Sequence, residues 1–147
     1  MEPIGRKRLP HDGAPFRASS SEGETYFITI CCVPRDTNQL AREEIWQAID
    51  ETLRFRESNG DLRCGLALAM PDHLHGLFGF PGMKSMQQVI TAVKSWMAGK
   101  HGIRWQRDFF DHRLRNPDSA AEKAHYIRMN PVRAGLVERT EDWPYQR

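Results

Sequence analysis

The sequence of 147 residues predicts one α+β domain, in which an antiparallel sheet of four strands carries helices packed on one face. Two observations predict it. Short runs rich in β-branched and aromatic residues alternate with longer segments in which apolar residues recur every three or four positions. Their order along the chain is β-α-β-β-α-β-α. This order is typical of a ferredoxin-like fold with one further helix at the C-terminal end.

Four strands are expected, over residues 25–33, 62–70, 73–80 and 105–115. The first is stopped by Pro34, and the second and third are joined by the tight turn Pro71-Asp72, which indicates a hairpin. The fourth segment looks extended, as a strand or as an ordered loop.

Three helices are expected, over residues 41–58, from 86 to about 99–102, and from 119 to about 130. Ser85 and Gln88 have the spacing of a capping box at the start of the second helix, and Ser119 and Glu122 repeat it for the third. Pro131 is expected to close the third helix, because the residue before a proline disfavours the α conformation.

Composition excludes several classes of protein. Residues 1–23 lack periodicity and are expected to be a flexible N-terminal arm, followed by one folded domain over 24–147. No apolar run approaches the roughly 18 residues of a membrane span. Three cysteines, two of them adjacent, favour reduced thiols in a core over a disulfide framework. We therefore expect a cytoplasmic protein without membrane contact.

Charge is distributed unevenly along the chain. Residues 21–60 hold four Lys or Arg against eight Asp or Glu, whereas residues 84–116 hold seven Lys or Arg against two Asp. Such asymmetry can mark a phosphate-binding face. A solvated helix face beside a basic loop would give the same pattern, so charge alone leaves both interpretations open.

Two pairs of residues could do chemistry. His73 and His75 stand two apart on an expected strand, so both imidazoles project from one face and could bind one ion, although a pair of surface histidines would look the same. Tyr126 and Asn130 stand four apart on an expected helix and share a flank. The alternative for this second pair is a tyrosine at the edge of the core and an asparagine that ends the helix.

Together the two pairs would make a coherent site. Two imidazoles and an amide oxygen could hold a metal ion with open positions for phosphate oxygens, where it would act as a Lewis acid. The phenol of Tyr126 could then attack a phosphate. Oxygen ligands suit Mg²⁺ or Mn²⁺, while imidazoles would also accept Zn²⁺ or Ni²⁺.

At these residues the sequence resembles a known family, the REP-associated tyrosine transposases of the HUH single-tyrosine superfamily, which includes the insertion sequence 200-like transposases. The resemblance spans about residues 24–147. It is carried by Thr-Tyr-Phe-Ile-Thr at 25–29, Met-Pro-Asp-His-Leu-His at 70–75, Trp-Gln-Arg-Asp-Phe-Phe-Asp-His at 105–112 and Tyr-Ile-Arg-Met-Asn-Pro-Val-Arg-Ala-Gly-Leu-Val at 126–137. Relatives commonly run on beyond the position of Arg147, so functions of a longer tail are expected to be absent.

The resemblance implies a ferredoxin-like fold, Tyr126 as nucleophile, and His73, His75 and Asn130 as ligands of Mg²⁺ or Mn²⁺. It further implies a DNA strand transferase and endonuclease that nicks single-stranded DNA near palindromic hairpins through a 5′-phosphotyrosine intermediate, as a monomer or a homodimer associated with the nucleoid.

Further basic residues fit DNA binding. Five would position a phosphate backbone, and His112 could touch a phosphate or act as a base, or could make only a structural hydrogen bond. The five are Lys94, Arg104, Arg107, Arg113 and Arg115.

Two alternatives to a DNA-cutting enzyme remain open. One is a domesticated, non-catalytic protein that binds DNA hairpins. The other is an unrelated metal-dependent hydrolase with a small substrate, against which the basic segment 84–116 and the lack of a Gly-rich phosphate loop argue mildly.

Overall fold

The computed structural model describes residues 23–147, so the arm expected over residues 1–23 lies almost wholly outside the described part. The expected order of elements is confirmed. In chain order the elements are β1 (Thr25–Cys31), α1 (Glu43–Ser58), β2 (Arg63–Met70), β3 (His73–Gly79), α2 (Met86–His101), β4 (Phe110–Leu114), α3 (Pro117–Arg133) and a short 3₁₀ helix, η1 (Thr140–Asp142).

The four strands form one antiparallel sheet in the order β2-β3-β1-β4. The central strands are thus β3 and β1, which pair from Tyr26 opposite Phe78 to Cys31 opposite His73. Pro71 and Asp72 alone connect β2 to β3, where Met70 stands opposite His73. The fourth strand is shorter than expected, and upstream of it only Trp105 makes an isolated bridge, to Cys32.

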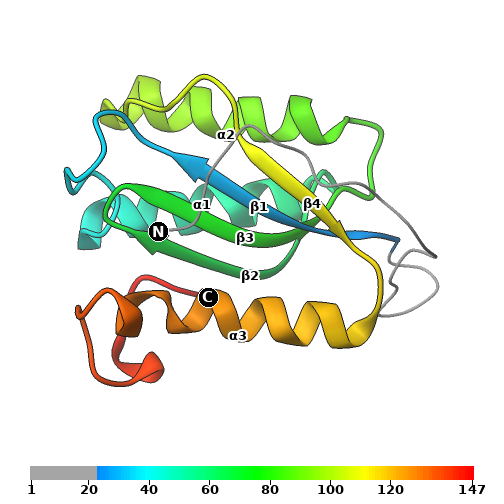
Figure 1. Cartoon of the computed structure of the whole chain (residues 1–147). Coiled ribbons are helices and arrows are strands. Elements are labelled where there is room, and N and C mark those ends of the chain that lie inside the picture. Colours follow the sequence, from blue (N-terminus) through cyan, green and yellow to red (C-terminus); the bar gives the residue numbers. More distant parts are fainter. Residues whose placement is uncertain (1–22) are drawn as a thin grey trace.

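The sheet separates two apolar cores. Figure 1 shows α1 and α2 on one side of the sheet and α3 on the other. Leu74 and Phe78 of β3 pack with α1 and α2, whereas Leu77 of the same strand packs with Ile127 of α3. Side chains alternate along β3, so every second one points towards α3. This alternation decides which β3 residues reach the candidate site.

The second helix begins as expected. The Ser85 hydroxyl accepts a hydrogen bond from the backbone amide of Gln88. The Gln88 side chain accepts one from the backbone amide of Ser85, so the expected capping box is present. Gly102 ends this helix in the left-handed conformation, which costs a glycine little.

The third helix differs from expectation at both ends. It starts at Pro117, because the Asn116 side chain accepts the amide of Ser119 and proline suits the first helical position. It also continues through Pro131 to Arg133. The missing proline amide removes one hydrogen bond, but the Ala134 amide still donates to the Asn130 carbonyl, and Pro131 is buried.

The C-terminal segment covers the β2 edge of the sheet, which sequence patterns did not indicate. The amides of Ala67 and Ala69 donate to the carbonyls of Arg147 and Tyr145, and the Trp143 indole donates to the Ala69 carbonyl. Figure 1 shows this segment returning beside β2. The segment satisfies backbone groups that an edge strand would otherwise expose.

The three cysteines are free thiols, as expected. Cys31 and Cys32 are buried and Cys64 is half-buried. None of the helices in the described part of the chain is long and apolar enough to cross a membrane.

Candidate active site

His73 and His75 lie side by side on the face of the sheet that α3 covers. Their ring centroids are 4.6 Å apart, with the rings at 75° to each other. Both are buried, His73 with 4% and His75 with 1% of its surface exposed, so they are not the surface pair that the sequence left open. Leu74 between them packs into the opposite core. The two imidazoles thus converge on one point beside α3.

Asp72 fixes the ring of His73. The Asp72 carboxylate lies 2.8 Å from Nδ1 of His73 and also accepts hydrogen bonds from the Arg35 side chain and the Asp36 amide. Burial alone would raise the pKa of Asp72, but these hydrogen bonds outweigh burial and hold it well below its usual range. A charged carboxylate on Nδ1 leaves Nε2 of His73 for a ligand, the arrangement usual for metal-binding histidines.

Thr29 plays the corresponding part for His75. Its hydroxyl lies 2.9 Å from Nδ1 of His75, across the β1–β3 pair. Burial, followed by the charges of His73, Lys123 and Arg133, lowers the pKa of His75 well below 6.5. His75 is therefore neutral near pH 7, as a metal-binding imidazole must be.

Tyr126 and Asn130 reach the same place from α3. The Tyr126 ring lies 6.5 Å from the His75 ring and 6.4 Å from the Phe27 ring, edge-on to both. One pocket of about 630 Å³ collects all four residues of the two pairs. It is lined by Asp36, Asn38, Met70, Pro71, Asp72, His73, His75, Tyr126, Asn130, Arg133, Ala134 and Leu136. Residues more than 50 positions apart in sequence are thus brought together.

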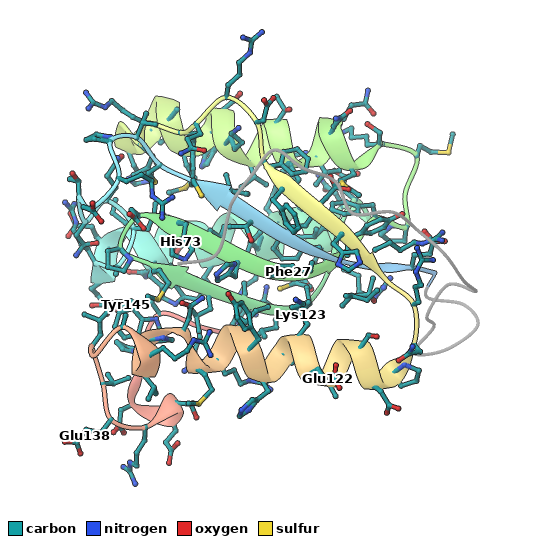
Figure 2. All side chains as sticks on the ribbon, viewed as in Figure 1. Phe27, His73, Glu122, Lys123, Glu138 and Tyr145 are labelled. Atoms are coloured by element: carbon teal, nitrogen blue, oxygen red, sulfur yellow. The ribbon has the colours of Figure 1, made fainter. Side chains whose placement is uncertain are left out.

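Two cations flank the Tyr126 ring, and sequence patterns did not single them out. Lys123 Nζ lies 5.2 Å from the ring centroid and Arg133 Cζ lies 4.4 Å from it. Figure 2 shows Lys123 reaching from α3 towards the sheet, near Phe27, while its neighbour Glu122 points away. The signal available in the sequence was the helical spacing of these residues relative to Tyr126.

The donor set fits a divalent cation in its chemistry. Two imidazoles with their Nδ1 atoms engaged, and the side chain of Asn130, border one pocket, and imidazole nitrogens and amide oxygens are ligands that divalent cations accept. Among residues 23–147 there is no group of three or more His, Cys, Asp and Glu side chains that could hold a metal. A metal here would therefore depend on the mixed set that includes the asparagine.

The other predicted DNA-binding residues lie outside this pocket. Lys94 donates to the carbonyls of Gln106 and Arg107, and it lines a separate hollow together with Arg107. Arg113 of β4 pairs with Glu24 at 2.7 Å. His112 and Arg115 belong to β4 and the residue after it, and Arg104 is exposed. Their contact with DNA stays a prediction.

Comparison with known proteins gives a consistent result. No model of a protein family matches the chain. It is 23% identical over 133 residues to the REP-associated tyrosine transposase of Escherichia coli, covering 88% of this chain and 79% of that protein. A Haemophilus influenzae protein provisionally given the same name is 27% identical over 149 residues, covering 88% and 82%.

Solved structures share the fold. The structure of a REP-associated tyrosine transposase bound to a REP hairpin superposes with a TM-score of 0.73 at 22% identity, over 91% of this chain and 82% of that one. A Deinococcus radiodurans protein, provisionally named a transposase, gives 0.51 at 15% identity, over 76% and 94%. The resemblance drawn from the sequence motifs and the predicted α+β fold are both confirmed.

Proposed function

Since the chain is a homologue of the REP-associated tyrosine transposases, we propose that it is a metal-dependent single-stranded DNA transesterase that cuts and rejoins strands next to palindromic hairpins. The observation that carries the proposal is the single pocket bordered by Tyr126, His73, His75 and Asn130. The hairpin substrate is supported by the solved relative, which is bound to a REP hairpin. Such a protein would work in the cytoplasm at the nucleoid, as a monomer or a homodimer.

In this proposal His73, His75 and Asn130 hold Mg²⁺ or Mn²⁺, which would supply Lewis acidity to a phosphate oxygen. Asp72 and Thr29 keep the two imidazoles oriented through their Nδ1 atoms. Because His75 is neutral near pH 7, it would offer the Nε2 lone pair to the metal in the tautomer whose Nδ1–H donates to the Thr29 hydroxyl.

Tyr126 is the nucleophile. Its phenolic oxygen forms a bond to phosphorus while the bond from phosphorus to the 3′ oxygen breaks. The phenol loses its proton, and the departing oxygen takes one up to become a 3′ hydroxyl. The 5′ phosphate stays on Tyr126, so the bond energy is conserved and a 3′ hydroxyl can reverse the step without ATP.

The test is a denaturing gel for a covalent protein–DNA band. The protein is incubated with Mg²⁺ or Mn²⁺ and labelled single-stranded hairpins drawn from repeats flanking its gene. A band is expected with metal, and none with Tyr126→Phe or His73→Ala. The matched controls are Tyr145→Phe and His101→Ala, which alter residues outside the pocket and should leave the band unchanged.

Two other results would redirect the proposal. Tight hairpin binding with no band under either ion would favour a hairpin-binding protein that does not cut. A band that persists in Tyr126→Phe would mean that another residue is the nucleophile.

A further inference from the structure

Three polar residues of α3 line the pocket, Tyr126, Asn130 and Arg133, and Lys123 stands about one turn before Tyr126 on the same face of the helix. Lys123, Tyr126, Asn130 and Arg133 fall within an arc of about 80° around the helix axis. Arg128 falls on the opposite side of the helix, and Figure 2 shows Glu122 pointing away from the sheet. A cation thus stands at each end of the row that contains Tyr126.

Lys123 is held against aromatic rings and has no anionic partner among residues 23–147. Its Nζ lies 4.7 Å from the Phe27 centroid and 5.2 Å from the Tyr126 centroid. Throughout the described residues 23–147, no acceptor lies within hydrogen-bond or ion-pair distance of this ammonium group. Lys123 is half-buried, and its ammonium group carries three hydrogen-bond donors.

Arg133 approaches the Tyr126 ring from the side of the pocket. Its guanidinium carbon lies 4.4 Å from the ring centroid, and one Nη atom donates to the Tyr126 carbonyl at 2.8 Å. This hydrogen bond orients the guanidinium but engages one of its five N–H donors. No carboxylate in the described part of the chain pairs with it, and it lines the pocket.

Other basic residues near the sheet are engaged by the fold itself. Arg35 binds Asp72, Arg113 binds Glu24, and Lys94 binds two backbone carbonyls. Lys123 and Arg133 therefore differ from them in that their donors face the Tyr126 ring without a carboxylate. An anion close to that ring could accept hydrogen bonds from both side chains and pair with both positive charges.

We propose that Lys123 and Arg133 form a two-cation clamp that binds a phosphate of single-stranded DNA beside Tyr126. The clamp rests on the proposed function, because it assigns the phosphodiester class of substrate to the same pocket. Its role is to hold the phosphate against the phenol and to balance the negative charge that grows on the phosphate oxygens during attack. The clamp adds no covalent step.

Binding is measured first, in a Tyr126→Phe background that cannot form the adduct but keeps the ring. Lys123→Met retains the apolar stem, Arg133→Gln retains polarity, and Arg128→Gln removes one charge from the far side of the same helix. The probe is a dye-labelled single-stranded hairpin oligonucleotide with a 5′ tail, followed by fluorescence anisotropy from 50 to 300 mM salt. Each clamp variant should lower the slope of log affinity against log salt by about 0.7, whereas Arg128→Gln should not.

Reaction is measured second, with Tyr126 intact and metal present. Lys123→Met and Arg133→Gln should slow adduct formation on the order of 10- to 100-fold relative to Arg128→Gln. Lys123→Arg should restore most of the rate, which a purely structural role for the lysine stem would not require. Circular dichroism and thermal melting establish that each variant is folded.

The outcomes separate the clamp from the proposed cleavage. Unchanged salt slopes and rates in both clamp variants, with adduct formation by the unaltered protein, would overturn the clamp alone. Reduced slopes without any adduct in the unaltered protein would support the clamp as a phosphate-binding site and overturn cleavage.

Discussion

The hydroxyl of Thr29 lies 2.9 Å from Nδ1 of His75, and both side chains are buried between the sheet and α3. Because Nδ1 is engaged by a neighbour on β1, the imidazole can offer only Nε2 to a ligand. The orientation of this imidazole is therefore set by the adjacent strand.

Replacing this hydroxyl should weaken metal binding. Thr29→Val keeps the shape of the side chain but removes the partner of Nδ1, so the affinity for Mn²⁺ should fall by roughly 10- to 100-fold in calorimetric titration. Thr52→Val, at another buried threonine, on α1, is the matched control and should bind Mn²⁺ as the unaltered protein does. Equal affinities for both variants would mean that Thr29 does not orient a ligand.

The Asp72 carboxylate should stabilise the fold in a pH-dependent way. Its pKa is held below the usual value, so its stabilisation is fully present above the unfolded pKa, about 3.9, and is lost as the pH falls below it. Asp72→Asn should cost about 2–3 kcal/mol in urea unfolding at pH 7, and the difference should shrink below pH 4. Glu138→Gln removes an exposed carboxylate and should leave the free energy of unfolding unchanged, both at pH 7 and below pH 4. A pH-independent loss in Asp72→Asn would contradict this origin.

The thiols should be nearly inert in the native protein. Burial raises the pKa of Cys32 to about 12 and that of Cys64 to about 11. At pH 8 very little thiolate is present, so both should react with a disulfide reagent on the order of 100-fold more slowly than in the unfolded chain. The rate for Cys64 should rise with pH as its thiolate forms, and Cys64→Ser identifies its contribution. Rapid labelling of Cys64 in the folded protein at pH 8 would refute this protection.

Two Gly→Ala substitutions should have opposite effects. A Cβ atom at Gly76 would overlap the ring of Phe78, which is buried and cannot move freely. Gly76→Ala should therefore destabilise the protein by about 1–3 kcal/mol. A Cβ atom at Gly99 of α2 would meet nothing within 4 Å, and alanine there should stabilise the helix by about 0.5–1 kcal/mol. Urea unfolding of the two variants and of the unaltered protein measures both changes in the free energy of unfolding.

The sequence predicted what depends on local periodicity. Alternation places His73 and His75 on one face, and helical spacing places Tyr126 and Asn130 on one flank, as the structure has them. It did not predict contacts between distant segments. The pairing of Arg147 with Ala67 and the approach of Thr29 to His75 depend on strand order and register. Neither can be read from the residue pattern of one segment alone.

The start of α3 was missed for a different reason. Ser119 and Glu122 have the spacing of a capping box, but Asn116 followed by proline is the stronger start and precedes them. Pro131 was expected to close the helix, yet it is buried and lies inside the helix. The tendency of proline to end a helix was overridden here. Burial of Pro131 stabilises the continued helix by more than the one missing hydrogen bond costs.

The hairpin that joins β2 to β3 has only two residues, Pro71 and Asp72, between paired strands. One residue inserted at this turn that shifted the register of β3 by one would move both histidines to the opposite surface of the sheet, among the side chains of α1 and α2, while every residue type of the site remained in the chain. The site is therefore encoded in a spacing as well as in residue identities. A change of length at this turn should therefore disturb the site more than most single substitutions around the pocket.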